Sequence, residues 1–172
     1  MTGAKNHVRK KYSSALQVKS KPHPTLRRLE QFVGKWKLKG QQHDSPFGPA
    51  AKISAVKKYR WLEGGFFLIH RLKGRVGGRK IACVEIIGRD AAGQSYQTRA
   101  FYSDGTTKTW QARERRGGWT LTGGWKTGER AEKVRCTTVF SEAGTIMTEK
   151  WERSSAGSGW QTFWDVIATK IS

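Results

Sequence analysis

Features that mark extracellular stability or metal binding are scarce in this chain of 172 residues. The two cysteines, Cys83 and Cys136, lie far apart inside strand-like runs. We therefore expect two small buried hydrophobic side chains, and no disulfide framework. The four histidines have no metal-ligand spacing, so neither a metal nor another cofactor is expected. They are His7, His23, His43 and His70.

Long apolar runs and catalytic signatures are also missing. No segment approaches the run of about 18 apolar residues that a membrane helix needs, and no apolar run follows the basic N-terminus as in a signal peptide. We therefore expect a cytoplasmic protein without a membrane span. The G-x-S-x-G elbow, the P-loop, the dinucleotide fingerprint and H-E-x-x-H are absent, which excludes the enzyme classes that they mark.

Acidic residues are few: the chain carries 33 Lys and Arg against 13 Asp and Glu, for a formal charge of +20. Such an excess favours polyanions or anionic surfaces, although a solvated lysine coat is the plain alternative. Residues 1–22 contain six lysines and arginines and no acid. This stretch has no core-forming period and is expected to be a mobile basic tail, with residues 23–172 forming one domain.

The hydrophobic pattern of that domain predicts one short helix and about ten strands. Leu26, Leu29 and Val33 form an apolar stripe over residues 24–33, which Gly34 ends. After it, lysines alternate with Trp36 and Leu38, as in a strand with one wet face. The predicted strands span 35–41, 52–61, 65–73, 79–88, 95–103, 107–114, 118–123, 131–140, 145–153 and 160–169.

Short turns separate most of these strands, among them Glu63-Gly64-Gly65, Val76-Gly77-Gly78 and Asp104-Gly105. Asp-Gly between alternating runs is a strong hairpin signal, and short connections make neighbouring strands antiparallel. The sequence thus predicts an all-β antiparallel meander closed into a barrel. Ten strands leave more interior room than eight, so we expect a ligand cavity.

Three motifs carry a resemblance to known barrels: FVGKW at 32–36, YRWLEGGFFLIHR at 59–71 and IGRD at 87–90. In this order they are similar to an uncharacterised bacterial family of lipocalin-like barrels in the calycin group, which also includes lipocalins, fatty-acid-binding proteins and nitrobindins. The resemblance spans residues 25–170. It implies a barrel with a cavity, and it implies no reaction because a fold does not fix a function.

The nitrobindin members of this group bind haem through a histidine near the C-terminus and favour G-x-W-x-G-x-G in the first strand. Residues 160–168 contain no histidine, and Leu38 stands at the middle glycine of that motif. The resemblance therefore does not predict haem binding of that kind.

Polar residues within the strands are the candidates for a site. His70 lies in a strand that is apolar on both faces, where it serves as a core histidine or as a ligand contact and general base. Glu85 shares a face with Ile81, Cys83 and Ile87, and burial would require a partner or raise its pKa. An outward carboxylate on the surface is the alternative for Glu85.

Further candidates come from the later strands. Arg99 could bind a ligand carboxylate, or it could be solvated. Glu149 and Asp165 are polar anchors if they face inward, and surface groups otherwise. Tyr102, Trp110 and Trp164 are candidates for the cavity wall along with Trp61 and Trp151. Simple core packing is the alternative for the tryptophans, and Trp36 should plug the closed end.

Three functions remain open from these residues. The first is binding of a small apolar or amphipathic ligand, which the charge allows to be anionic. The second is acid–base chemistry in the cavity, such as cyclisation or isomerisation, with His70 and Glu85 as the catalytic pair. The third is weak nucleic-acid contact through the basic tail and loops, where the run 110–119 places two tryptophans among arginines. The oligomeric state has no signal in the sequence.

Overall fold

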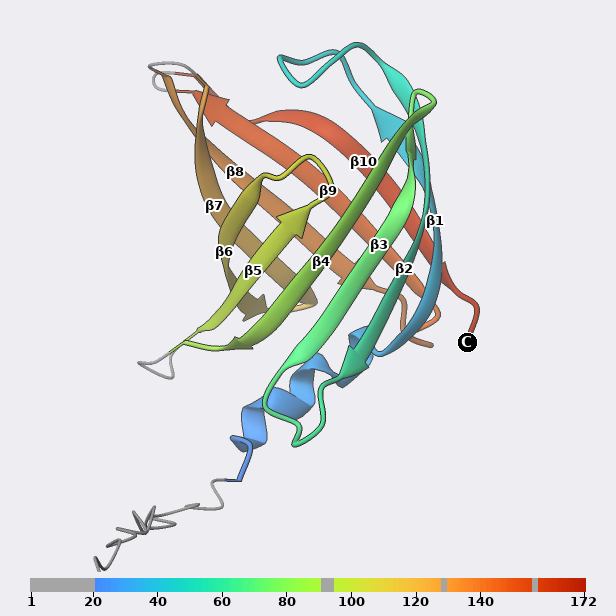
Figure 1. Ribbon diagram of the computed structural model, residues 1–172, viewed down its shortest axis with the longest axis vertical. Helices are drawn as coiled ribbons and strands as arrows, with labels where there is room; N and C mark the ends of the chain where they lie inside the picture. The colour runs from blue at the N-terminus through green and yellow to red at the C-terminus, as the bar shows by residue number, and fades with distance from the viewer. Residues whose placement is uncertain (1–20, 91–94, 128–129, 156–157) are drawn as a thin grey trace, which may run out of the picture.

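The computed structural model describes residues 21–90, 95–127, 130–155 and 158–172, so most of the predicted tail lies outside the described residues. Within these ranges, ten antiparallel strands close into one barrel with a short helix at one end (Figure 1). Each strand pairs with its neighbours in sequence, and β1 pairs with β10 to complete the circle. The strands are β1 (Gly34–Gln42), β2 (Ala51–Trp61), β3 (Leu68–Val76), β4 (Arg79–Arg89), β5 (Tyr96–Tyr102), β6 (Thr107–Arg115), β7 (Gly118–Thr127), β8 (Arg130–Phe140), β9 (Ile146–Ser155) and β10 (Gln161–Lys170).

Alternation of buried and exposed side chains explains why these residues form a barrel. In β2 every second residue, from Ile53 to Tyr59, is buried, and the residues between them are exposed. Side chains of a strand point to opposite faces in turn, so one face fills the interior and the other meets solvent. The predicted all-β, ten-stranded antiparallel barrel of calycin-like fold is therefore confirmed.

Two strands differ from their predicted ranges by three or more residues at a boundary. The third strand begins at Leu68 rather than at 65, because Gly64 and Gly65 have φ of 93° and 75° and belong to a turn. The seventh strand continues past residue 123 to Thr127, with glycines inside it. A side chain at Gly123 would collide with the Trp110 ring, so this glycine lets the ring lie against the wall.

The helix η1 (Pro24–Phe32) is a 3₁₀ helix, capped by a hydrogen bond from the Thr25 amide to the His23 side chain. Its buried residues are Leu26, Leu29 and Phe32. A 3₁₀ helix has three residues per turn, so a spacing of three places them on one face. The predicted apolar stripe of Leu26, Leu29 and Val33 was wrong at Val33, which lies beyond the end of the helix. Phe32 is the third buried residue of the helix instead. No helix of the described residues is long and apolar enough to cross a membrane.

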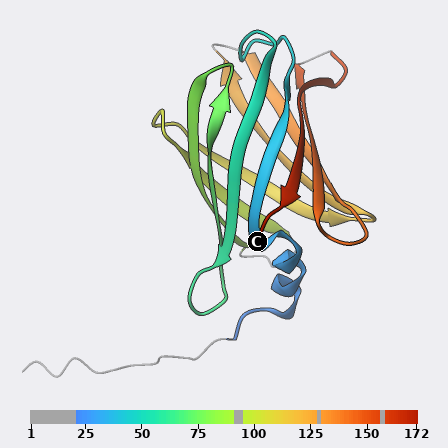
Figure 2. The same cartoon turned by 90° about the vertical axis from the view of Figure 1, so that its right-hand side faces the viewer.

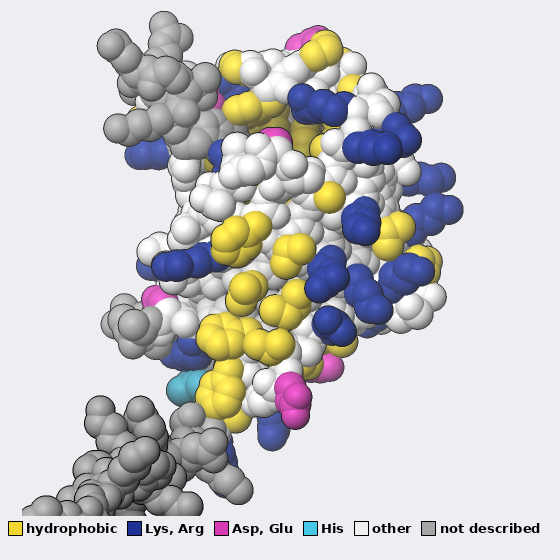
Figure 3. All heavy atoms as spheres, viewed as in Figure 1, with side chains coloured by type: hydrophobic (Ala, Val, Ile, Leu, Met, Phe, Trp, Pro, Cys, Tyr) yellow, Lys and Arg dark blue, Asp and Glu magenta, His cyan; other side chains and the backbone are white. Residues whose placement is uncertain are grey.

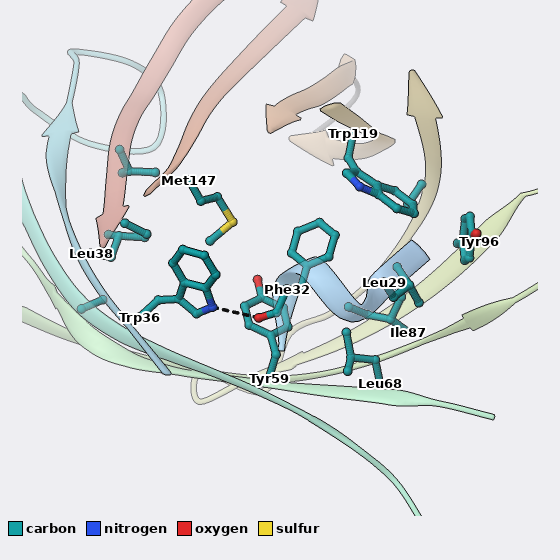
Figure 4. Packing of buried hydrophobic residues seen from close by; sticks show 14 of the residues in the cluster. Leu29, Phe32, Trp36, Leu38, Tyr59, Leu68, Ile87, Tyr96, Trp119 and Met147 are labelled. Atoms are coloured by element: carbon teal, nitrogen blue, oxygen red, sulfur yellow. Dashed lines mark hydrogen bonds between the residues drawn. The ribbon is translucent and has the colours of Figure 1, made fainter. Parts of the chain in front are cut away.

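The helix closes the end of the barrel where β1 begins (Figure 2). Phe32 inserts among aromatic rings of the barrel wall (Figure 4), with ring centroids 5.5 Å from Tyr59, 5.5 Å from Trp119 and 5.0 Å from Phe140. Trp36 Nε1 donates to the Phe32 carbonyl at 2.8 Å, so the backbone of Phe32 is held in place as well as its side chain. The turns β1–β2, β3–β4, β5–β6, β7–β8 and β9–β10 lie at the other end, because the strands run up and down.

Candidate ligand-binding cavity

Between the helix and the opposite end, the barrel encloses a cavity of about 440 Å³. Three exposed residues also line this cavity, namely Arg79, Asp104 and Thr106. They lie at the β3–β4 and β5–β6 turns, so the cavity reaches the surface at the end opposite to the helix. Small-molecule sites typically occupy about 300–1,000 Å³, which makes this volume sufficient for a compact ligand.

One wall of the cavity is aromatic. Trp110, Trp151, Phe163 and Trp164 come from β6, β9 and β10 and line the space. Trp151 lies 5.7 Å from Trp110 and 6.5 Å from Trp164 between ring centroids, in edge-on geometry. Trp164 Nε1 donates to Gln42 Oε1 at 2.9 Å, which holds that ring in place. Such rings offer a large, rigid apolar surface to a ligand.

A β-bulge lets two consecutive residues of β10 join this wall. The register of β10 against β9 shifts between Thr162 and Trp164. A bulge interrupts the strict alternation of faces, so Phe163 and Trp164 can both line the cavity although they are adjacent in sequence. Alternation alone places only one of them inside.

The interior also carries a buried ion pair, which adjoins this wall. Lys57 is 4% exposed and Glu149 is 6% exposed. Lys57 Nζ donates to Glu149 Oε1 at 2.5 Å, and Trp151 Nε1 donates to the other carboxylate oxygen at 3.4 Å. Two buried charges are tolerated only with close pairing and added hydrogen bonds, which this geometry supplies.

Next to it, Glu85 joins His70 and Thr98 in a second buried cluster. Glu85 Oε2 accepts from His70 Nδ1 at 2.9 Å, and Oε1 accepts from the Thr98 hydroxyl at 2.5 Å. The strands set this contact, because His70 in β3 lies directly opposite Glu85 in β4. An ionised carboxylate only accepts hydrogen bonds, so Nδ1 carries the proton in this pair.

The pKa of Glu85 is lowered from its ordinary value of 4.5. Burial is the largest influence on this pKa and acts to raise it. The hydrogen bond and charge of His70, the Thr98 hydroxyl and the charge of Lys57 together outweigh burial. Glu85 is thus a carboxylate at neutral pH, rather than the protonated acid that its apolar neighbours in the sequence alone would favour.

Tyr59 covers the His70 ring. The two rings are parallel within 7°, with centroids 4.2 Å apart. Burial, ahead of the charges of Glu149 and Glu85, raises the pKa of the Tyr59 hydroxyl well above 10. His70 Nε2 is buried and has no hydrogen-bond partner among the described residues. The histidine is therefore oriented by Glu85 and leaves one ring nitrogen unused.

Both cysteines line the cavity as buried, free thiols. Burial, followed by the charge of Glu85, raises the pKa of Cys83 to about 12. Burial likewise raises the pKa of Cys136 well above 9. Since the thiolate is the reactive form, neither side chain is activated as a nucleophile.

Six of the predicted ligand contacts lie on the cavity wall: His70, Glu85, Tyr102, Trp110, Glu149 and Trp164. Arg99 is the exception and requires a correction. It is exposed, and in register it lies opposite Ile86, which also faces outward. Its neighbours Thr98 and Ala100 point inward instead. Asp165 is also exposed, where it pairs with His43 at 2.8 Å.

The tryptophans of the run 110–119 also require a correction. Trp110 is 3% exposed and Trp119 is 1% exposed, and both rings point into the barrel. Buried rings cannot stack on nucleic-acid bases. The prediction that the tryptophans of this run contact nucleic acid is therefore wrong. Trp61 lies outside the cavity lining, where its Nε1 donates to Glu30 at 2.7 Å. Trp36 is fully buried at the closed end, where it was expected.

The sequence analysis did not single out Lys57, Thr98 or Tyr59. The alternation of faces along β2 could have identified two of them as inward-facing, since Lys57 and Tyr59 share the face of Ile53 and Ala55. Among 33 basic residues, nothing in the sequence marks Lys57 as the one that is buried. Among the described residues, no group of three His, Cys, Asp or Glu side chains could hold a metal ion.

Comparison with known proteins places this barrel in a family. The sequence profile of DUF1579, a protein family of unknown function, matches residues 21–150. The chain belongs to the DUF1579 family. This agrees with the expected uncharacterised family of lipocalin-like barrels. No curated protein matches the sequence.

Two solved structures share the fold of this DUF1579 protein. One is Rv2717c from M. tuberculosis, with a TM-score of 0.61 and 12% identity over 88% of this chain and 99% of that one. The other is the S-type phycobiliprotein lyase CPES from Guillardia theta, with a TM-score of 0.53 and 11% identity over 85% and 92%. At such identities the likeness concerns the fold alone.

Proposed function

We propose that this DUF1579 barrel binds a small apolar or amphipathic molecule with an aromatic part. The observation that carries the proposal is the cavity of about 440 Å³ with one aromatic wall and one polar wall. Ligand sites typically combine a mostly apolar lining with a few converging polar groups. The ring system of the ligand would pack against Trp110, Trp151 and Trp164, and a polar group would face the Lys57 and Glu85 side.

The mouth of the cavity supports a ligand with an anionic group. Lys57 is already neutralised by Glu149, so the interior supplies no spare positive charge. At the mouth, Arg79 and Lys108 line the cavity together with the single acid Asp104. An anionic head group would therefore be accommodated near the surface, with the apolar body inside.

Two fluorescent probes of matched shape test this proposal. N-phenyl-1-naphthylamine is neutral, and 1-anilinonaphthalene-8-sulfonate is its anionic relative. Both are expected to quench tryptophan fluorescence, because four tryptophans line the cavity. At about a hundred times its dissociation constant, a probe stabilises the fold by about 2.7 kcal/mol, or about 5–10 °C in melting temperature. If the probes neither quench tryptophan fluorescence nor shift the melting temperature, the proposal of a ligand cavity is refuted.

Two variants locate the binding. Leu121→Trp fills the cavity from β7 and should abolish binding of both probes, whereas Val139→Trp, on the outer face of β8, should leave it intact. Circular dichroism checks that the strands persist in each variant. Arg79→Gln with Lys108→Gln should weaken the sulfonate several-fold and leave the neutral probe unaffected. Equal weakening of both probes would argue against an anionic head at the mouth.

The buried Glu85–His70 pair supports a second candidate, acid–base catalysis on the bound ligand. A carboxylate that orients an imidazole is the arrangement of many general bases. His70 Nε2, unpaired among the described residues, would take a proton from a ligand carbon or oxygen. The test incubates the protein in D₂O with an aryl ketone and follows α-proton exchange by NMR. Exchange that His70→Ala abolishes supports catalysis, and exchange at the solvent rate leaves binding as the function.

A further inference from the structure

The outer face of β1 to β4 carries ten exposed basic side chains, which we call the cationic face. They are Lys35, Lys37, Lys39, Lys52, Lys58, Arg60, Arg71, Lys73, Arg75 and Lys80. Across β1 to β5 the only acid is Glu85, which points into the barrel. None of the ten makes an ion pair with a described residue.

The strand register places these charges directly beside one another. Lys35 lies opposite Lys58, and Lys58 lies opposite Arg71, so one row crosses three strands with three positive charges. Arg75 similarly lies opposite Lys80. Like charges opposite each other in a sheet are destabilising. A fold that retains such rows without acidic partners is suited to an external anionic surface that neutralises them.

An apolar patch adjoins the cationic face. It consists of Phe67, Ile69, Val84, Ile86 and Phe101 on the outer face of β3 to β5 and the turn before β3. Phe67 and Phe101 are 43% and 47% exposed, and Val84 and Ile86 are each 38% exposed. In Figure 3 hydrophobic side chains gather on the face shown, with Lys and Arg side chains beside them.

The patch is contiguous, and basic residues border it. Ile69 lies opposite Ile86, and Val84 lies opposite Phe101. The row of Ile69 and Ile86 continues into Arg60 on one side and Arg99 on the other, and Val84 lies opposite Arg71. A side chain at Gly88 would meet the Phe67 ring, so this glycine leaves room for the ring against β4. The surface therefore combines exposed aliphatic and aromatic groups with arginine side chains at its border.

We propose that the cationic face and the apolar patch together dock the protein on a lipid bilayer that contains anionic lipids. Lysine and arginine side chains would contact the phosphate head groups, and the patch would enter the boundary between head groups and acyl chains. Nucleic acid suits this surface less well. Three of the five patch residues are aliphatic and cannot stack on bases, and the phosphate backbone offers them no apolar partner.

The charge half of the proposal is tested by vesicle co-sedimentation of the full chain. The vesicles contain either phosphatidylcholine alone or an equimolar mixture with phosphatidylglycerol. The row variant, Lys35→Gln, Lys58→Gln and Arg71→Gln together, should lower the partition constant on the mixed vesicles by about a hundred-fold. The control variant, Arg113→Gln, Arg115→Gln and Lys133→Gln, removes the same charge from β6 to β8 and should lower it much less. Equal losses in both variants, or unchanged binding, would overturn the proposal.

The apolar half is tested with Ile86→Ser and Phe101→Ser together, against the exposed control pair Val139→Ser and Ile167→Ser. Only the first pair should weaken binding to the mixed vesicles, and it should leave binding of a duplex DNA fragment unchanged. If the patch variant has no effect on vesicles while the row variant abolishes DNA binding, the surface serves nucleic acid and the proposal fails. The probe assay of the cavity is independent of all these variants.

Discussion

At the residue scale, the buried pair of Lys57 and Glu149 allows a sharp stability test. Lys57→Met leaves Glu149 as an uncompensated buried charge and should lower the free energy of unfolding by about 3–5 kcal/mol. Lys58→Met, one residue further along β2, removes an exposed lysine and should change it by about 0.5 kcal/mol or less. Urea unfolding followed by tryptophan fluorescence measures both.

A double variant separates charge from packing at this pair. Lys57→Met combined with Glu149→Leu removes both charges and should recover most of the lost stability. If the double variant is as unstable as Lys57→Met alone, lost packing rather than the unpaired carboxylate explains the effect.

Glu85 should give the protein an acid-sensitive contribution to stability. Its pKa is lower in the folded state than its ordinary value of 4.5, so its stabilising contribution is complete above that value and is lost as the pH falls through the folded pKa. Glu85→Gln should therefore show a shallower loss of stability than the unmodified chain below about pH 5. Parallel slopes in thermal melts across this range would contradict the prediction. Acids on the surface are common to both proteins and cancel in the comparison.

How far a residue could be placed from the sequence depended on alternation. The alternation predicted that Glu85 shares a face with Cys83 and Ile87, and the structure confirms this. It could not decide Arg99, because both faces of β5 mix polar and apolar residues and the register with β4 is a tertiary property. The pairing of Lys57 with Glu149 was out of reach, since these residues are 92 positions apart and meet only once the barrel closes.

At the scale of elements, the helix η1 should act as a structural plug. Phe32→Ala removes a ring that contacts Tyr59, Trp119 and Phe140, and should cost about 3–5 kcal/mol of unfolding free energy. Gln31→Ala, in the same helix but with only a local hydrogen bond, should cost about 0.5 kcal/mol or less. A small effect of Phe32→Ala would mean that the barrel closes without its helix.

Turn chemistry is the reason that the order of elements was predictable from sequence. Glycines with positive φ, such as Gly77 and Gly105, sit in the turns that the sequence marked. The helix type was less accessible, because Leu26, Leu29 and Val33 fit an α-helical stripe as well as Leu26, Leu29 and Phe32 fit a 3₁₀ one. The bulge in β10 carried no signal, since Phe163 and Trp164 are equally apolar.

At the scale of the whole molecule, unbalanced positive charge is kept out of the barrel interior. The interior ion pairs, Lys57 with Glu149 and His70 with Glu85, match each basic group with an acid. The unbalanced charge lies outside the interior, and ten of the exposed basic side chains form the cationic face. The formal charge of +20 therefore describes the exterior and gives no indication of what the cavity accepts.

This segregation predicts how salt acts on stability. The positive charges within a row, such as Lys35, Lys58 and Arg71, repel one another in the folded protein. Salt weakens this repulsion, because the screening length falls from about 30 Å at 10 mM to about 8 Å at 150 mM. The melting temperature should therefore rise with sodium chloride over this range. The row variant, with glutamine at these three positions, should melt at a higher temperature than the unmodified chain in low salt and should respond less to added salt. General effects of salt on apolar surface act on both proteins alike, so the difference between them isolates the rows. If the row variant melts lower in low salt, the lysine and arginine stems stabilise the sheet by packing along it, and the charge rows carry no net cost for an anionic surface to relieve.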